Sequence, residues 1–242
     1  MQKIIKIFKK SLYLFESFLI MGDLKKFTSK NNGRFTIKLK NLRPCLGDKT
    51  AFTDFDLHYI YHPAWAMRIL VRTKPAEHVD ISSTLAFSTM LSAFLPTKFY
   101  DYRPADIALS NLDCKKADLN ALPFPANSIP SLSCMHTVEH IGLGRYGDAI
   151  YPDGDLKAIK ELKRVLAING NLLFVVPVVL PKIAFNAHRV YSYEQIISYF
   201  SDFELKEFTL ISEKKKTIIN QANPSLVKDE NYGCGCFWFI KK

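Results

Sequence analysis

Three features are missing from the 242-residue chain, and each absence limits the structures that the chain can form. It contains no run of about 20 apolar residues, which a membrane-spanning helix requires. Its five cysteines are an odd number without a CxxC pair, which argues against a disulfide framework and favours a reducing, cytoplasmic setting. It has no glycine between Gly47 and Gly142, so every tight loop in that stretch must form without one.

The net charge of +10 is concentrated near the N-terminus. Residues 1–49 contain twelve Lys or Arg against three acids (+9), whereas residues 50–242 contain twenty-one against twenty (+1). Proteins that bind nucleic acid spread basic side chains over the binding face, because phosphate contacts dominate the affinity. The nearly neutral larger part therefore argues against a nucleic-acid substrate.

Residues 1–49 are predicted to form a basic extension. Apolar residues recur every three or four positions from Ile4 to Leu19, and lysines largely occupy the other side, as in an amphipathic helix. Two interpretations stay open: a helix packed on the domain or on a partner, or peripheral contact of residues 1–21 with an anionic membrane at the inner face. The polar residues that follow are interpreted as a connector with one short strand at 34–40.

Residues 50–242 are predicted to form one α/β domain. An aromatic-rich segment, 50–75, is interpreted as a lid, and from Glu77 onward short apolar strands alternate with helical stretches. The expected strands are 78–81, 98–101, 112–117, 131–135, 172–176, 205–211 and 235–240, and the expected helices are 84–95, 153–166 and 193–200. The last two strands pair around a polar insert, 213–231. The predicted fold is a doubly wound, mostly parallel, Rossmann-like seven-stranded sheet with an antiparallel last strand.

Several polar residues stand at the carboxyl ends of predicted strands, where open parallel sheets bind their ligands. Asp80 ends the first strand, Asp101 ends the second, Asp118 follows the third and His136 follows the fourth. An acid at the tip of the second strand, about 20 residues after the first, can accept both ribose hydroxyls of a nucleoside cofactor. The same acids can also be ordinary turn residues, and this alternative stays open.

The stretch from Ala117 to Pro177 resembles the second half of a class I S-adenosylmethionine-dependent methyltransferase. It contains an acid after a strand, the turn Leu122-Pro123-Phe124-Pro125, a buried strand followed by His136-Thr137-Val138-Glu139-His140, an amphipathic helix and a second buried strand. The resemblance implies S-adenosylmethionine as the cofactor. By position in the family's pattern, the implied cofactor-binding residues are Asp80, Ser82, Ser83, Asp101, Asp118 for the adenine amino group and Leu119 for the ring.

The first cofactor loop departs from that family's pattern. Family members usually carry a glycine-rich D/E-x-G-x-G-x-G motif there, whereas this chain reads Asp80-Ile81-Ser82-Ser83-Thr84-Leu85-Ala86. A side chain at each glycine position narrows the approach to the cofactor and restricts φ. Ser82 and Ser83 are small and can donate hydrogen bonds, so a pocket is still expected.

The candidates for chemistry lie after the fourth and fifth predicted strands. Histidine is suited to proton transfer near neutral pH, and methyl transfer otherwise requires mainly alignment of the reactants. The candidate catalytic residues are His136, Glu139, His140 and His188. The candidate substrate-binding residues are Arg145 in the glycine-rich loop 142–147, Arg189, Tyr59 and Trp65. The loop that contains Arg145 can instead be a flexible connector, Arg189 can instead pair with a nearby acid, and the aromatic residues can instead be core.

No metal site is predicted. His58 and His62 stand four residues apart, but no glutamate follows His58 as in H-E-x-x-H and no third ligand is evident.

Residues 55–65, 136–147 and 186–191 resemble a bacterial group of methyltransferase-like proteins often encoded among surface-polysaccharide genes. This implies methyl transfer to a small or sugar-like acceptor. The alternative hypothesis is a non-catalytic relative that docks on a membrane-associated polysaccharide assembly.

Overall fold

The computed structural model describes residues 18–242, and the chain divides into two compact units, Met1–Phe55 and Asp56–Lys242. Most of the predicted amphipathic helix lies outside the described residues. A helix over residues 18–29 extends into the stretch that the sequence indicated as a connector. Among the described residues, no helix is long and apolar enough to span a bilayer.

The strand predicted at 34–40 is wrong. This stretch is irregular and ends in a short 3-10 helix, η1 (Leu39–Asn41). An isolated strand leaves its backbone donors and acceptors without partners, and residues 18–55 contain no second strand with which it could pair.

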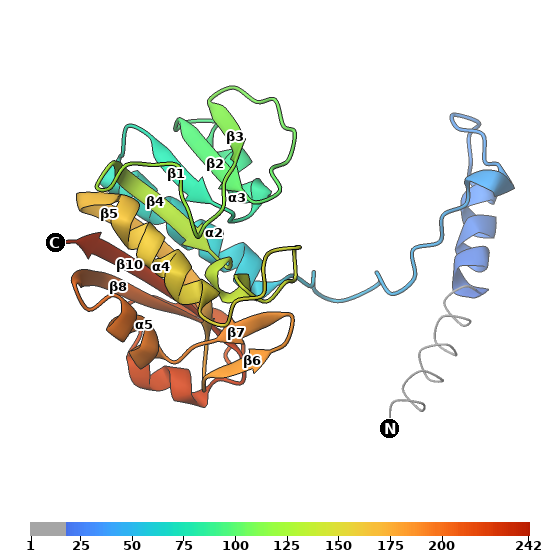
Figure 1. Cartoon of the computed structure of the whole chain (residues 1–242). Helices are drawn as coiled ribbons and strands as arrows, with labels where there is room; N and C mark the ends of the chain where they lie inside the picture. The colour runs from blue at the N-terminus through green and yellow to red at the C-terminus, as the bar shows by residue number, and fades with distance from the viewer. Residues whose placement is uncertain (1–17) are drawn as a thin grey trace. The chain divides into compact units, whose positions relative to one another are not determined.

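The second unit is built on an eight-stranded sheet in the order β3-β2-β1-β4-β5-β10-β8-β9 (Figure 1). Its strands are β1 (His78–Ile81), β2 (Thr97–Asp101), β3 (Leu112–Lys116), β4 (Ile129–Met135), β5 (Leu166–Val178), β8 (Phe203–Ser212), β9 (Thr217–Ile219) and β10 (Gly233–Lys241). The first five are parallel, and β10 runs antiparallel to both β5 and β8. The predicted fold class is confirmed, and the eighth strand, β9, comes from the polar insert.

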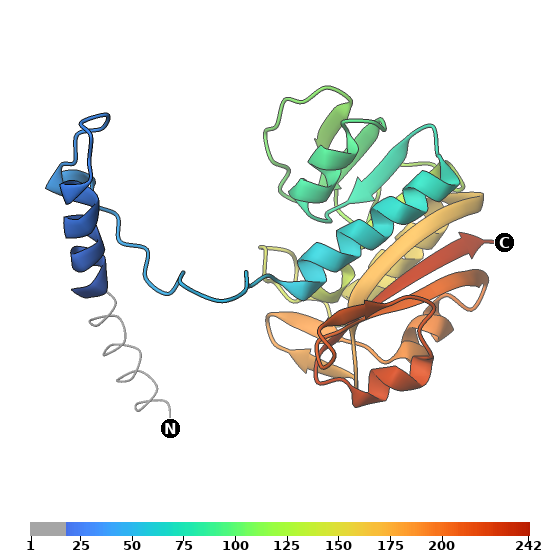
Figure 2. The same ribbon diagram turned by 180° about the vertical axis from the view of Figure 1, so that it is seen from behind.

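Helices cover both faces of the sheet, as Figures 1 and 2 show from opposite sides. The helices are α2 (Leu57–Thr73), α3 (Leu85–Leu91), α4 (Gly154–Val165) and α5 (Tyr193–Tyr199). One apolar cluster joins α2 and α3 to the sheet, and a larger one joins α4 and α5 to the opposite face. Residues 57–73 therefore form a helix that packs on the sheet.

Local signals explain where these helices begin. Asp56 and Thr84 accept hydrogen bonds from the backbone N–H groups of Tyr59 and Phe87, which caps α2 and α3. Ser192 forms a reciprocal capping box at the start of α5. Side chains thus cap the N-termini of α2, α3 and α5, and two of the capping residues, Asp56 and Thr84, border the site described below.

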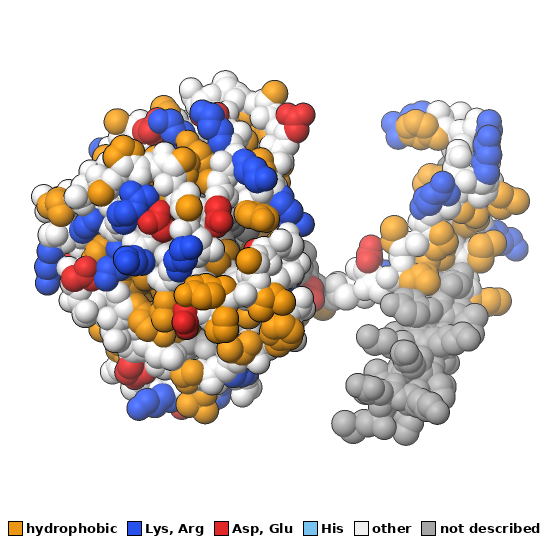
Figure 3. All heavy atoms as spheres, in the orientation of Figure 1, with side chains coloured by type: hydrophobic (Ala, Val, Ile, Leu, Met, Phe, Trp, Pro, Cys, Tyr) orange, Lys and Arg blue, Asp and Glu red, His pale blue; other side chains and the backbone are white. Residues whose placement is uncertain are grey.

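Two local features involve β5 and the segment that follows it. The left-handed residue after α4 is Asn169, with φ +61°, and it lies within β5 where the pairing with β4 shifts register. A two-stranded hairpin, β6 (Lys182–Ala184) and β7 (His188–Val190), was not predicted. Figure 3 shows apolar side chains gathered over this hairpin, where Ile183 and Phe185 are exposed. Two short helices, η2 (Val138–His140) and η3 (Pro224–Asp229), complete the unit.

Candidate functional site

Three adjoining cavities lie at the carboxyl ends of β1, β2 and β4. Their volumes are about 520, 260 and 200 Å³. Ser82 and Tyr102 belong to the walls of the first two, and His136 and His140 belong to the walls of the last two. The shared walls make them one crevice, which we call the strand-end crevice, at the position where parallel α/β sheets bind ligands.

The loop after β1 adopts a left-handed backbone without glycine. Ser82 has φ +52°, its backbone N–H donates to the Tyr100 carbonyl at 2.7 Å, and its hydroxyl donates to the same oxygen at 3.2 Å. Ser83 Oγ accepts from the backbone N–H of Met135 at 3.1 Å. These contacts tie the loop to β2 and β4, and both serines line the crevice as predicted.

Asp80 does not line the crevice, which corrects its predicted contact with the cofactor. Its side chain is 0% exposed and accepts hydrogen bonds from Ser88 at 2.7 Å and from Ser133. His78 contacts Ser133 at 2.9 Å and Ser131 at 2.8 Å through its two ring nitrogens. Burial raises the pKa of Asp80 to about 6 and lowers the pKa of His78 to about 3. Asp80 therefore belongs to a buried network under the first loop.

The predicted adenosine-binding residues lie along the crevice wall. Asp101, at the tip of β2, is half-buried, lines the middle cavity and accepts from the Arg103 N–H at 2.7 Å. The exposed Asp118 and the buried Leu119 line the largest of the three cavities, as does Ile141. The structure thus brings Asp101, Asp118 and Leu119 to one crevice.

His136 and Glu139 form a buried pair at the junction of the middle and smallest cavities. His136 has φ +55° directly after β4, and its Nδ1 donates to Glu139 Oε1 at 2.9 Å. Burial opposes the charged form of His136, but the adjacent Cys234 sulfur and the Glu139 carboxylate outweigh it and raise its pKa to about 10. His136 is therefore protonated at neutral pH and is a poor proton acceptor in this state.

His140 and His188 flank the smallest cavity. His140 Nδ1 donates to the Ala187 carbonyl at 2.6 Å, and its ring lies 6.3 Å from that of His188. Burial, only partly opposed by Glu139, lowers the pKa of His188, so this ring is neutral near pH 7. The exposed Arg145 and Tyr59 also line this cavity. These four predicted residues converge on one space.

Two predicted substrate-binding residues are structural. Arg189 is buried, donates to the backbone carbonyls of Ile141 at 2.7 Å and Pro152 at 2.8 Å, and lies 3.5 Å from Asp155. All of these partners lie inside the protein. Arg189 needs them because burying an unpaired guanidinium would be costly.

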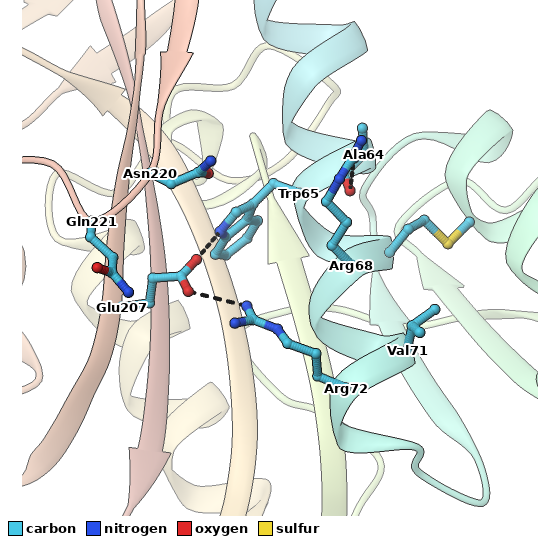
Figure 4. A pocket seen from close by; sticks show the side chains of 9 residues that line it. Ala64, Trp65, Arg68, Val71, Arg72, Glu207, Asn220 and Gln221 are labelled. Atoms are coloured by element: carbon cyan, nitrogen blue, oxygen red, sulfur yellow. Dashed lines mark hydrogen bonds and ion pairs between the residues drawn. The ribbon is translucent and has the colours of Figure 1, made fainter.

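Trp65 lies in a separate cavity of about 790 Å³ between α2 and β8. Figure 4 shows its indole and Arg72 both directed at Glu207, to which they donate at 3.0 and 3.1 Å. Although this cavity is larger than any of the three in the strand-end crevice, these polar groups already satisfy one another, so we do not regard it as the active site.

The sequence reasoning did not assign five residues of the smallest cavity to the site: Asp56, His58, Tyr146, Glu213 and Tyr232. His58, on the first turn of α2, lines it, and so does Tyr232, just before β10. Their rings stack 5.2 Å apart, and the His58 ring stacks on His136 at 5.5 Å. Nothing in the sequence spacing predicts that residues 58, 136 and 232 lie together, because only the folded sheet with α2 packed on it brings them into contact.

The comparisons with known proteins bear on the fold. Residues 126–232, less than half of the chain, match a family described as "Caenorhabditis protein of unknown function, DUF268". A comparison with curated proteins gave no match.

Three solved structures illustrate the structural likeness, each covering 74% of this chain. The YcgJ protein from Bacillus subtilis is 14% identical, with 99% of its own chain covered and a TM-score of 0.50. The N-methyltransferase NodS from Bradyrhizobium japonicum, solved with S-adenosylhomocysteine, is 13% identical, with 85% covered and a TM-score of 0.50. The cyclase SpnF is 13% identical, with 80% covered and a TM-score of 0.51. At these identities the likeness shows the fold alone, a Rossmann-like α/β fold that an N-methyltransferase shares with a cyclase.

Proposed function

We propose that this protein is an S-adenosylmethionine-dependent methyltransferase that acts on a hydroxyl group of a small or sugar-like acceptor. The observation that carries the proposal is the strand-end crevice. Asp118 and Leu119 line its largest cavity, Asp101 lines the middle cavity with His136 and His140, and His188 lines the adjoining smallest cavity. Because the fold also includes a cyclase, the fold by itself does not decide the reaction.

The residues present fit the adenosine part of the cofactor. Ribose hydroxyls and the adenine amino group are donors that need acceptors, and the Asp101 and Asp118 carboxylates supply them. Leu119 provides an apolar wall for the base. When bound, the cofactor supplies an electrophilic methyl group on a sulfonium.

The first loop is compatible with the same ligand. Ser82 adopts the positive φ that a glycine gives in such a loop, and its hydroxyl turns back to β2. The serine side chains nevertheless narrow the end of the crevice where the amino-acid part would lie. This narrowing favours a second candidate, a non-catalytic protein that keeps the fold as a docking platform.

His188 is the residue best suited to accept the acceptor's proton. It is neutral near pH 7 because burial lowers its pKa, whereas His136 is held protonated beside Glu139. Arg145 and Tyr59, at the exposed rim of the same cavity, would orient the acceptor. We include in this proposal a role in surface-polysaccharide synthesis.

The test is transfer of a radiolabelled methyl group from S-adenosylmethionine to a panel of monosaccharides and nucleotide sugars. We expect His188→Gln to lower kcat by about 10²-fold or more, as general-base loss does, with cofactor affinity unchanged. Lys182→Gln, an exposed change on the same hairpin, is the matched control. Methylation that is equally fast in His188→Gln would contradict the assignment, and absence of cofactor binding by the wild type would favour the docking protein.

A further inference from the structure

Three potential metal ligands meet beside the smallest cavity, although they are far apart in the sequence. His58 comes from the start of α2, His136 follows β4, and Cys234 lies on β10. One donor atom from each lies within 4.8 Å of the other two. The side chains are almost completely buried, with exposed fractions of 4%, 8% and 0%. Buried polar groups require partners, and this set has too few.

The spacing of two donors already suits one metal ion. Zinc is bound at about 2.0 Å by imidazole nitrogen and about 2.3 Å by thiolate sulfur, so two such ligands of a tetrahedral ion lie about 3.5 Å apart. His136 Nε2 and Cys234 Sγ are 3.3 Å apart. A weak thiol–imidazole hydrogen bond also accounts for this single contact, but it leaves His58 unexplained.

His58 supplies the independent observation. Its Nε2 is buried and has no hydrogen-bond partner in the described part of the chain, and Glu213 Oε1, at 3.7 Å, is too far to provide one. Neutral imidazole and thiolate are the forms that bind metals, so a bound ion would take the place of the protons on His136 Nε2 and on the Cys234 thiol.

The surroundings of His136 match a pattern common to metal-binding histidines. Such a histidine usually donates its other ring N–H to a carboxylate, which fixes the tautomer and orients the ring. Here Nδ1 donates to Glu139 Oε1 at 2.9 Å, so Nε2 is the nitrogen that faces Cys234. His62, packed against His136 with ring centroids 5.1 Å apart, is fixed by the His58 carbonyl at 2.6 Å.

We propose that His58, His136 and Cys234 bind a zinc-like divalent cation, with the fourth coordination position open to the smallest cavity. Two imidazoles and one thiolate suit zinc, and three protein ligands with an open position are typical of catalytic rather than structural zinc sites. His58 and His136 both line that cavity, which also contains His188 and Arg145. The three proposed metal ligands are not among the residues proposed to bind the methyl donor, so this site does not depend on that cofactor. If the proposed function holds, the open position lies at the acceptor.

The test is titration of metal-depleted full-length protein with Zn²⁺ by calorimetry and with Co²⁺ by absorption. We expect one equivalent bound with a Kd of about 1 µM or tighter, and a sulfur-to-cobalt charge-transfer band. Cys234→Ala should abolish the band, and Glu139→Gln should weaken binding by about 10- to 100-fold. Cys45→Ala, which removes an exposed thiol, is the matched control and should change nothing.

X-ray absorption of the zinc-loaded wild type makes the result independent of how well the variants fold. The expected first shell contains one sulfur and at least two imidazole nitrogens. The proposal is overturned if the wild type binds no stoichiometric Zn²⁺, if the shell contains no sulfur, or if the cobalt band persists in Cys234→Ala and disappears in Cys45→Ala. Absence of S-adenosylhomocysteine binding would leave it intact.

Discussion

Replacing Ser133 with alanine is expected to destabilise the protein more than the equivalent change at Ser131. The Ser133 hydroxyl donates its single proton to Asp80 and therefore accepts from Nε2–H of His78, at 2.9 Å. His78 Nδ1 must then accept from Ser131, at 2.8 Å. All four side chains are buried, so water cannot replace a lost partner.

The magnitude follows from the number of groups left unpaired. Ser133→Ala leaves the His78 N–H without a partner and removes one of the donors to the buried Asp80 carboxylate. Each of these losses costs about 1–3 kcal/mol, for a total of about 2–6 kcal/mol. Ser131→Ala leaves only one nitrogen unpaired and should cost about 1–3 kcal/mol. Asp80 keeps its bond from Ser88 in both variants.

Urea unfolding followed by circular dichroism at pH 8, where Asp80 is ionised, measures both variants against the wild type. The expected result is a lower unfolding midpoint for Ser133→Ala than for Ser131→Ala, with unchanged denaturant dependence. Equal midpoints would refute the reasoning that Ser133 connects two buried polar groups.

Three further predictions concern acid stability, an internal arginine and the N-terminal unit. His78 has a pKa near 3 in the native state and 6.5 in the unfolded state, so the unfolded state binds a proton first and stability falls as the pH drops below 6.5. Asp80 has a native pKa near 6 and an unfolded pKa of 3.8, so the native state binds this proton first and offsets the loss between about pH 6 and 3.8. Asp80→Asn should therefore lose about 1.4 kcal/mol more per pH unit than the wild type in that range, and parallel stability curves from denaturant titrations would contradict this. Arg189→Met should cost about 3–5 kcal/mol because it leaves the buried Asp155 carboxylate without its cation and with the Tyr191 hydroxyl as a donor. The exposed control Arg145→Met should cost less than about 0.5 kcal/mol, and equal thermal shifts would argue against an internal role. If residues near the N-terminus contact anionic membranes, which is one of the two interpretations of the sequence, replacing the exposed Phe18 and Phe27 with serine in the full-length chain should reduce flotation with phosphatidylserine vesicles. Equal flotation would dismiss these side chains as an anchor.

The sheet was predictable because its signals are local. Buried strands such as 172–176 read as continuous apolar runs, and α4 shows an apolar face with acids at its start and bases at its end. The strand β9 and the two strands of the β6–β7 hairpin were missed because each of these strands has only three residues, too few for a periodic pattern to appear.

The site was only partly predictable. Position after a strand correctly brought Asp101, Asp118 and His136 to one crevice, since that edge is fixed by the parallel topology. Position could not reveal that Asp80 faces inward, because this depends on serines on α3 and β4. Nor could it bring Cys234 to His136, because that contact depends on β10 lying beside β5.

Binding of S-adenosylhomocysteine, measured by calorimetry with full-length protein, tests the central claim most directly. We predict one equivalent bound, and a loss of about tenfold or more in affinity for Asp101→Ala, because a hydrogen bond to a charged group contributes about 1.5–3 kcal/mol. Asp106→Ala, an exposed acid outside the crevice walls, should bind as the wild type does. No heat from the wild type at millimolar ligand would contradict the account.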